Sequence, residues 1–125
     1  MILLLALLLA MPQAGTYGAV CFDPAKGDLN GTRVVLSGTE AAPEVLFQHC
    51  APSCTRHRTV SASLNRDRLE FEIASLAKED QRAKFSGRVN GKAMTLDGLT
   101  PSYGFKRATL RINQRCPKDT VLADP

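Results

Sequence analysis

The sequence predicts an all-β fold, a small antiparallel meander of about seven strands that forms a barrel or a sandwich and is stapled by disulfides. Apolar and polar residues alternate along most of the chain, which is typical of strands with one buried and one solvated face. Asn90 and Gly91 separate two such runs, and this dipeptide is the strongest short-range hairpin signal. Four cysteines occur among 125 residues, an even number that favours disulfides in a small exported domain.

The chain begins with an apolar run over residues 2–11, which is too short for a membrane-spanning helix of roughly 20 residues. Its length matches the h-region of a signal peptide, and small residues suited to cleavage after Ala14 or Gly18 follow it. We therefore predict a signal peptide over residues 1–18 and one domain over residues 19–125. No Lys or Arg precedes the run, so the alternative is a buried helix of the mature protein.

Two short strands are predicted over residues 32–38 and 44–49, and a hairpin over residues 59–75 follows them. The hairpin has a polar turn at residues 65–68. Its apolar side chains alternate with polar ones and would share one face: Val60, Ala62, Leu64, Leu69, Phe71 and Ile73. Residues 75–83 are expected to form a loop or one short helical turn.

The clearest hairpin covers residues 84–97, with Asn90 and Gly91 as its turn. In this register, three pairs form the mostly apolar face: Phe85–Leu96, Gly87–Met94 and Val89–Lys92. Three more pairs form the polar face: Lys84–Asp97, Ser86–Thr95 and Arg88–Ala93. In this register, the apolar and polar side chains of both strands separate onto two opposite faces. The apolar side chains of this hairpin are therefore predicted to be buried together.

A last strand is predicted over residues 107–115, with Ala108, Leu110 and Ile112 on its apolar face. One apolar face per strand has to be covered, either by curling the sheet into a barrel or by packing it on a second sheet. Because the consecutive strands look hairpin-joined, we favour an up-and-down meander over a Greek-key sandwich.

Residues 68–73 and 83–98 resemble the lipocalin-like, or calycin-like, β-meander modules of exported bacterial proteins. In that pattern, a strand with alternating apolar residues precedes a glycine-punctuated hairpin. The matching positions here are Leu69, Phe71, Ile73, Phe85, Gly87, Val89, Gly91, Leu96 and Gly98. The resemblance implies a barrel-like fold and transfers no catalytic residue.

The four cysteines allow three disulfide pairings. We favour Cys21–Cys116, which brackets the strand-forming region, together with Cys50–Cys54 within one Pro-containing loop. The rival pairing crosses, joining Cys21 to Cys50 or Cys54 and Cys116 to the other cysteine.

Residues 47–58 contain both histidines and two of the cysteines. His49, Cys50, Cys54 and His57 include zinc-ligand types, but they are crowded for a tetrahedral site, and arginines flank His57. A thioredoxin-like redox pair needs a spacing one residue shorter than the one between these cysteines. We therefore predict a stapled loop and no metal, with a copper or zinc site at His49 and His57 as the alternative.

The formal net charge is +4, and no long run of like charges indicates a nucleic-acid-binding tail. This modest excess of basic over acidic residues predicts that the protein has a weak preference for acidic surfaces. Glu70 and Glu72 form a carboxylate pair of the kind used in glycoside hydrolysis, but their alternation with apolar residues favours a solvated face. Phosphate-loop, nucleophile-elbow and zinc-protease motifs do not occur in the sequence.

These observations favour a non-enzymatic exported β-domain that acts as a binding or envelope-accessory module without a cofactor. The alternative is an inhibitor of a secreted or host enzyme, presenting Arg56, His57 and Arg58 on the stapled loop. A small-ligand carrier ranks lower, because few aromatics and thin strands indicate a filled interior. We expect a periplasmic or secreted monomer with a protein or acidic-surface partner, no nucleic acid, and no membrane span in the mature chain.

Overall fold

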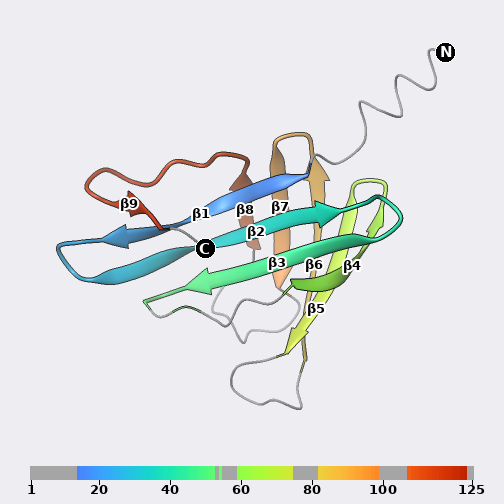
Figure 1. Ribbon diagram of the computed structural model, residues 1–125, viewed down its shortest axis with the longest axis horizontal. Coiled ribbons are helices and arrows are strands. Elements are labelled where there is room, and N and C mark those ends of the chain that lie inside the picture. Colours follow the sequence, from blue (N-terminus) through green and yellow to red (C-terminus); the bar gives the residue numbers. More distant parts are fainter. Residues whose placement is uncertain (1–13, 53, 55–58, 75–81, 99–106, 124–125) are drawn as a thin grey trace.

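The computed structural model describes residues 14–52, 54, 59–74, 82–98 and 107–123, and its nine elements are all β-strands (Figure 1). The strands are β1 Gly15–Asp23, β2 Asp28–Gly38, β3 Pro43–Cys50, β4 Thr59–Asn65, β5 Arg68–Ala74, β6 Arg82–Asn90, β7 Ala93–Gly98, β8 Arg107–Arg111 and β9 Val121–Leu122. They form one antiparallel sheet of order β8-β7-β6-β5-β4-β3-β2-β1-β9. The predicted antiparallel meander is confirmed, and no helix of the described residues is long and apolar enough to cross a membrane.

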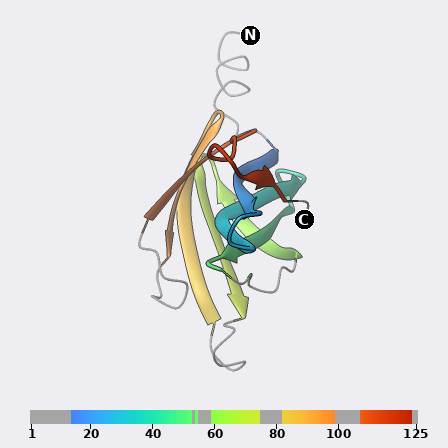
Figure 2. The same ribbon diagram turned by 90° about the vertical axis from the view of Figure 1, so that its left-hand side faces the viewer.

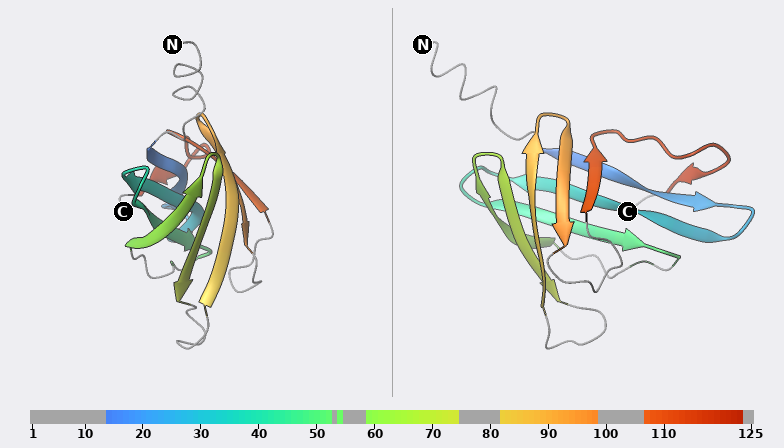
Figure 3. Two further views of the ribbon diagram at one scale, coloured as in Figure 1. Left: turned by 90° about the vertical axis from the view of Figure 1, so that its right-hand side faces the viewer. Right: turned by 180° about the vertical axis from the view of Figure 1, so that it is seen from behind.

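The sheet curls into a half-barrel, so that β1–β3 run across β5–β8 (Figures 1 and 2). Seen from behind, β5–β8 cross in front of β1–β3 (Figure 3). The two ends of the meander meet where Tyr17 of β1 forms an isolated bridge with Ile112, directly after β8. The Tyr17 hydroxyl also donates a hydrogen bond to the Gly91 carbonyl at 3.2 Å. A barrel-like curl is therefore the solution that this chain adopts to cover its apolar face.

The core lies on the concave face and is centred on three phenylalanines from three strands. The ring centroids of Phe47 and Phe85 lie 4.7 Å apart, and those of Phe71 and Phe85 lie 5.2 Å apart. Other side chains that are almost completely buried around them include Tyr17, Val34, Val45, Leu69, Val89, Met94 and Leu96. The apolar faces predicted for the strands from residue 59 onward all point to this core.

The β6–β7 hairpin has the predicted faces but not the predicted register. Val89 lies opposite Met94, and Asn90 lies opposite Ala93, so the two turn residues are Gly91 and Lys92 rather than Asn90 and Gly91. Gly91 has a φ of 62°, which suits the glycine-favouring first position of a type II′ turn. The partners shift by two positions, and an even shift leaves every side chain on its original face.

The strand prediction was incomplete at both ends of the chain. It missed β1 and β9, and β2 begins at Asp28 rather than at residue 32. Strand β1 begins at Gly15, within the segment predicted as a signal peptide, and the Tyr17 side chain is fully buried. Residues 17–21 are all buried, so β1 lacks the alternation on which the prediction depended.

Candidate functional site

The loop after β3 is stapled by a disulfide between Cys50 and Cys54, which are four residues apart. The N–H of Leu29 in β2 donates a hydrogen bond to the Pro52 carbonyl at 3.3 Å. This contact anchors the loop to the β1–β2 hairpin. The basic residues proposed as its binding element, Arg56, His57 and Arg58, lie outside the described residues.

His49 precedes the stapled loop at the end of β3 and is half-buried. Its Nδ1 lies 2.8 Å from the Thr32 hydroxyl oxygen on the neighbouring strand β2. His57, its partner in the alternative metal site, lies outside the described residues. Within the described part of the chain, no three His, Cys, Asp or Glu side chains are grouped to hold a metal ion. Cys50 and Cys54 are disulfide-bonded, which makes their sulfurs poor metal ligands.

A second disulfide joins Cys21 of β1 to Cys116, with a Cα–Cα distance of 5.7 Å. The structure therefore has the pairing favoured from the sequence, not the crossed one. Downstream of Cys116, β9 pairs with β1 and forms one edge of the sheet. The C-terminal part of the domain is thus tied to β1 by a covalent bond and by a short ladder.

Arg33 reinforces this attachment from the convex face of β2. Its side chain is only 4% exposed, and its Nη1 donates a hydrogen bond to the Ala123 carbonyl at 2.8 Å. Its Nη2 donates to the Gln48 side-chain oxygen on β3. The sequence has no signal that distinguishes Arg33, because an arginine between Thr32 and Val34 of a strand resembles any solvent-facing position.

The two glutamates of β5 lie on the convex face, as expected for a solvated face. Glu70 forms an ion pair with Arg68 at 3.5 Å, and Glu72 forms one with Lys84 of β6 at 3.5 Å. Each carboxylate is thus accompanied by its own cation and is in contact with solvent.

Strand β4 lies between β3 and β5 and pairs with each of them along a different part of its length. Its residues 62–65 pair with β5, whereas its residues 59–61 pair with β3. The β4–β5 ladder consequently ends at the pair Ala62–Phe71. Beyond that pair, none of the described residues forms a ladder with residues 72–74 on the side of β5 that faces β4.

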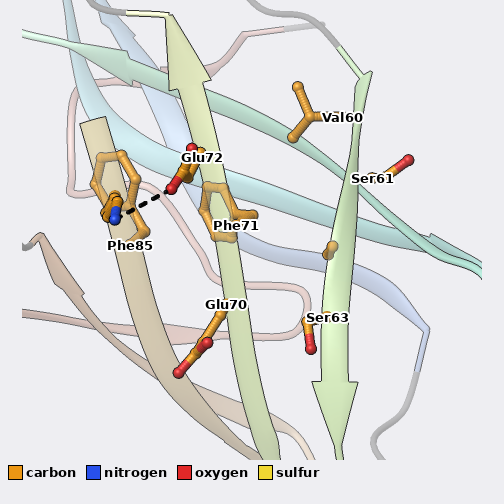
Figure 4. Close-up of a pocket in the computed structure, with 9 residues that line it drawn as sticks. Val60, Ser61, Ser63, Glu70, Phe71, Glu72 and Phe85 are labelled. Carbon is orange, nitrogen blue, oxygen red and sulfur yellow. Dashed lines mark ion pairs between the residues drawn. The ribbon is translucent and has the colours of Figure 1, made fainter. Parts of the chain in front are cut away.

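The divergence of β4 and β5 opens a recess of about 810 Å³, which we call the β4–β5 recess (Figure 4). Its walls combine polar and apolar side chains from three strands: Val60, Ser61, Ala62, Ser63, Glu70, Phe71, Glu72, Lys84 and Phe85. The aromatic rings of Phe71 and Phe85 are only 4% and 2% exposed, and they close its floor against the core. The sequence contains no signal for this recess, since it depends on where the β4–β5 ladder ends.

No family model, curated protein or solved structure matches this chain. The resemblance to lipocalin-like modules consequently remains a prediction. The site must be interpreted from its own geometry, in which the β4–β5 recess and the stapled loop are two features suited to binding.

Proposed function

We propose that this chain is an exported, non-enzymatic binding domain, and that the β4–β5 recess receives an extended segment of a partner protein. The observation that carries the proposal is the early end of the β4–β5 ladder. Alternate residues of an unpaired strand edge direct their N–H and C=O groups outward, and such an edge can add a strand from another chain. Residues 72–74 of β5 offer that edge.

The lining of the recess supports an extended peptide over a compact ligand. Val60 and Ala62 are half-buried and offer apolar contact near the floor, while Ser61 and Ser63 offer hydroxyls at the rim. A strand presents its side chains alternately to two faces, so apolar residues of the partner could face the floor and polar ones the rim. The three closely packed phenylalanine rings beneath leave the carrier function less favoured.

Non-enzymatic function is supported by the ion pairs of Glu70 and Glu72, the carboxylates nearest to the recess. A catalytic acid usually has a desolvated carboxyl group, whereas these side chains are 55% and 41% exposed beside their cations. This environment suits recognition of a polar partner better than proton transfer.

An oxidising location, periplasmic or extracellular, is supported by the two disulfides and by the apolar amino-terminal run. Cleavage after Ala14 would leave β1 whole. Cleavage after Gly18 would remove Tyr17 from the core and the hydrogen bond that it donates to Gly91. We therefore place the start of the mature chain at Gly15.

The alternative function, inhibition of a secreted or host enzyme, is favoured by the anchoring of the stapled loop. The Cys50–Cys54 bond and the contact between Leu29 and Pro52 fix the start of the segment that continues to Arg56, His57 and Arg58. A loop fixed in this way loses less conformational entropy on binding, as protein inhibitors of enzymes require.

A capture experiment distinguishes these functions. The oxidised chain starting at Gly15 would be immobilised and exposed to the exported protein fraction, and captured proteins would be identified by mass spectrometry. Ser61→Trp fills the recess at an exposed position, and Thr16→Trp is the matched control at an exposed position of β1. We expect the wild type and Thr16→Trp to capture the same protein, and Ser61→Trp to capture about tenfold less of it.

The opposite pattern would favour the inhibitor. If Ser61→Trp captures normally while the double variant Arg56→Ala/Arg58→Ala does not, the stapled loop is the binding element. Capture that none of these variants alters would exclude both surfaces as the binding site.

A further inference from the structure

A second, smaller recess lies on the convex face of β5–β8 and has a volume of about 380 Å³. Its lining contains six polar side chains: Arg68, Ser86, Arg88, Thr95, Asp97 and Arg107. The three arginines come from three different strands, β5, β6 and β8. Their guanidinium groups therefore surround the recess rather than follow one strand.

The strand register places two of these cations directly opposite each other. Arg68 of β5 faces Arg88 of β6, and like charges at opposite positions of an antiparallel pair destabilise the sheet. In the next strand, Thr95 faces Arg88 and contributes a hydroxyl. Opposed arginines beside hydroxyl donors are a suitable arrangement for an anion, which would relieve the repulsion and accept hydrogen bonds from both groups.

Each arginine of the lining forms one ion pair with a carboxylate. Arg107 pairs with Asp97 at 2.8 Å within the lining, whereas the partners of Arg68 and Arg88 are Glu70 and Asp67. Neither of those two carboxylates belongs to the lining. A ligand in the recess therefore meets three guanidinium groups and the Asp97 carboxylate, while Glu70 and Asp67 balance the charges of Arg68 and Arg88 from outside the lining.

The arginines also retain hydrogen-bonding capacity. A guanidinium group has five N–H donors in a planar fork, and Arg68 contacts Glu70 through its Nε at 3.5 Å. Arg88 contacts Asp67 through Nη1 at 3.1 Å. Side-chain exposures of 65% for Arg68 and 72% for Arg88 leave both groups accessible to a ligand from solvent.

Gly87 keeps β6 and β7 close together beneath the recess. A Cβ atom at this position would collide with the carbonyl oxygen of Thr95, so only glycine fits between the two strands. Glycine inside a strand often marks such a close approach of a neighbouring backbone. The hydroxyls of Ser86 and Thr95, which flank this contact, are thereby held beside the arginines.

We infer that this recess binds a tetrahedral dianion, the phosphate group of a phosphomonoester or free phosphate. Arginine forks recognise phosphate oxygens with paired hydrogen bonds, and Arg68 and Arg88 lie opposite each other on neighbouring strands beside the Thr95 hydroxyl. The inference goes beyond the proposed function, because it concerns a different surface from the β4–β5 recess and a different class of ligand. Its success or failure is independent of any protein partner.

The primary test is a titration of the oxidised, isotope-labelled chain with inorganic phosphate, with chloride at equal ionic strength as reference. We expect the backbone amide signals of Ser86, Gly87 and Thr95 to shift with phosphate in a saturable manner, and to shift little with chloride. Thermal unfolding of the same samples should occur at a higher temperature in phosphate, because a ligand that binds only the folded state stabilises it.

Arg88→Gln removes one of the two opposed charges, and Arg111→Gln makes the same change on an exposed residue of β8 outside the lining. We expect Arg88→Gln to weaken phosphate binding about tenfold and Arg111→Gln to weaken it less than about twofold. In phosphate-free buffer, Arg88→Gln should unfold at the wild-type temperature or above, since it relieves the opposition of Arg68 and Arg88. Arg68→Gln serves as a second variant if Arg88→Gln does not fold.

The source of the phosphate is distinguished by two further probes, a soluble sugar phosphate and phosphatidylcholine vesicles with or without phosphatidic acid. A response to inorganic phosphate and the sugar phosphate supports a free or soluble ligand. Binding only to vesicles with phosphatidic acid, lost in Arg88→Gln, supports a lipid headgroup. The inference is overturned if no probe binds, or if Arg111→Gln weakens binding as much as Arg88→Gln does, which would indicate attraction to net charge alone.

Discussion

The convex face of the curled sheet is charged in one half of the sheet and largely covered in the other half. In β5–β8, that face is charged, and four ion pairs lie on it: Arg68–Glu70, Lys84–Glu72, Arg88–Asp67 and Arg107–Asp97. In β1–β3, much of it is covered, because residues 17–21 and Arg33 are buried and the C-terminal segment is attached there. Both disulfides also begin in this half, at Cys21 and Cys50.

This difference shows that a small curled sheet can stabilise its second face either with solvated charges or with a covalently attached cover. The two solutions have different energetic origins. Exposed ion pairs add little stability individually, so β5–β8 must depend on its apolar face. The covered half depends in addition on cross-links that restrict the unfolded chain.

The largest expected effect is the loss of the Cys21–Cys116 bond. Its 95-residue separation gives a stabilisation of about 4–5 kcal/mol in the chain-entropy model, against about 2 kcal/mol for the four-residue separation of Cys50–Cys54. Urea unfolding of the double variants Cys21→Ala/Cys116→Ala and Cys50→Ala/Cys54→Ala measures both losses. Equal losses would mean that the cover over β1 contributes no more than the stapled loop.

The next effect tests the apolar face of β5–β8. Leu96 of β7 is fully buried, so Leu96→Ala should lower the free energy of unfolding by about 2–5 kcal/mol. Its neighbour Thr95 is half-exposed on the convex face, and Thr95→Ala should cost less than about 1 kcal/mol. Chemical denaturation of both variants provides the measurement. Similar losses at the two positions would contradict the observed division of faces.

The smallest expected loss of stability is tested by removing one basic side chain from each half of the sheet. Arg33→Met removes a buried guanidinium that bonds Ala123 and Gln48, and should cost about 1.5–3 kcal/mol. Lys84→Met removes a cation whose side chain is 64% exposed, and should cost roughly 0–1 kcal/mol. Denaturation gives these values, and amide hydrogen exchange at Ala123 should accelerate only in Arg33→Met. Unchanged exchange there would show that Arg33 does not hold the C-terminal segment.

The charged half is the part that could be predicted from the sequence. Its strands alternate, and alternation alone is enough to place Leu69, Phe71 and Ile73 in the core and Glu70 and Glu72 in solvent. Even the wrong turn position between β6 and β7 preserves the two faces of that hairpin, because the shift is even.

The covered half could not be predicted in the same way. When both faces of a strand are buried, as in β1, alternation disappears and only an apolar run remains. Strand β9 has only two residues, which are too few to show an alternation of apolar and polar side chains. The β4–β5 recess is also invisible in the sequence, since the choice of partner by residues 59–61 depends on strand β3 and on the curl of the whole sheet.

The order of the strands also affects how the chain can fold as it is synthesised. Every ladder except one joins strands that follow each other in sequence, so most strand pairings form between segments that are synthesised one after the other. Strand β1 is the exception, because Ile112 and β9 are made last, and the ribosome produces β1 first. Until they arrive, β1 is an apolar edge strand able to pair with β1 of another nascent chain, and oxidation of Cys21 with Cys116 would then lock the correct neighbour in place.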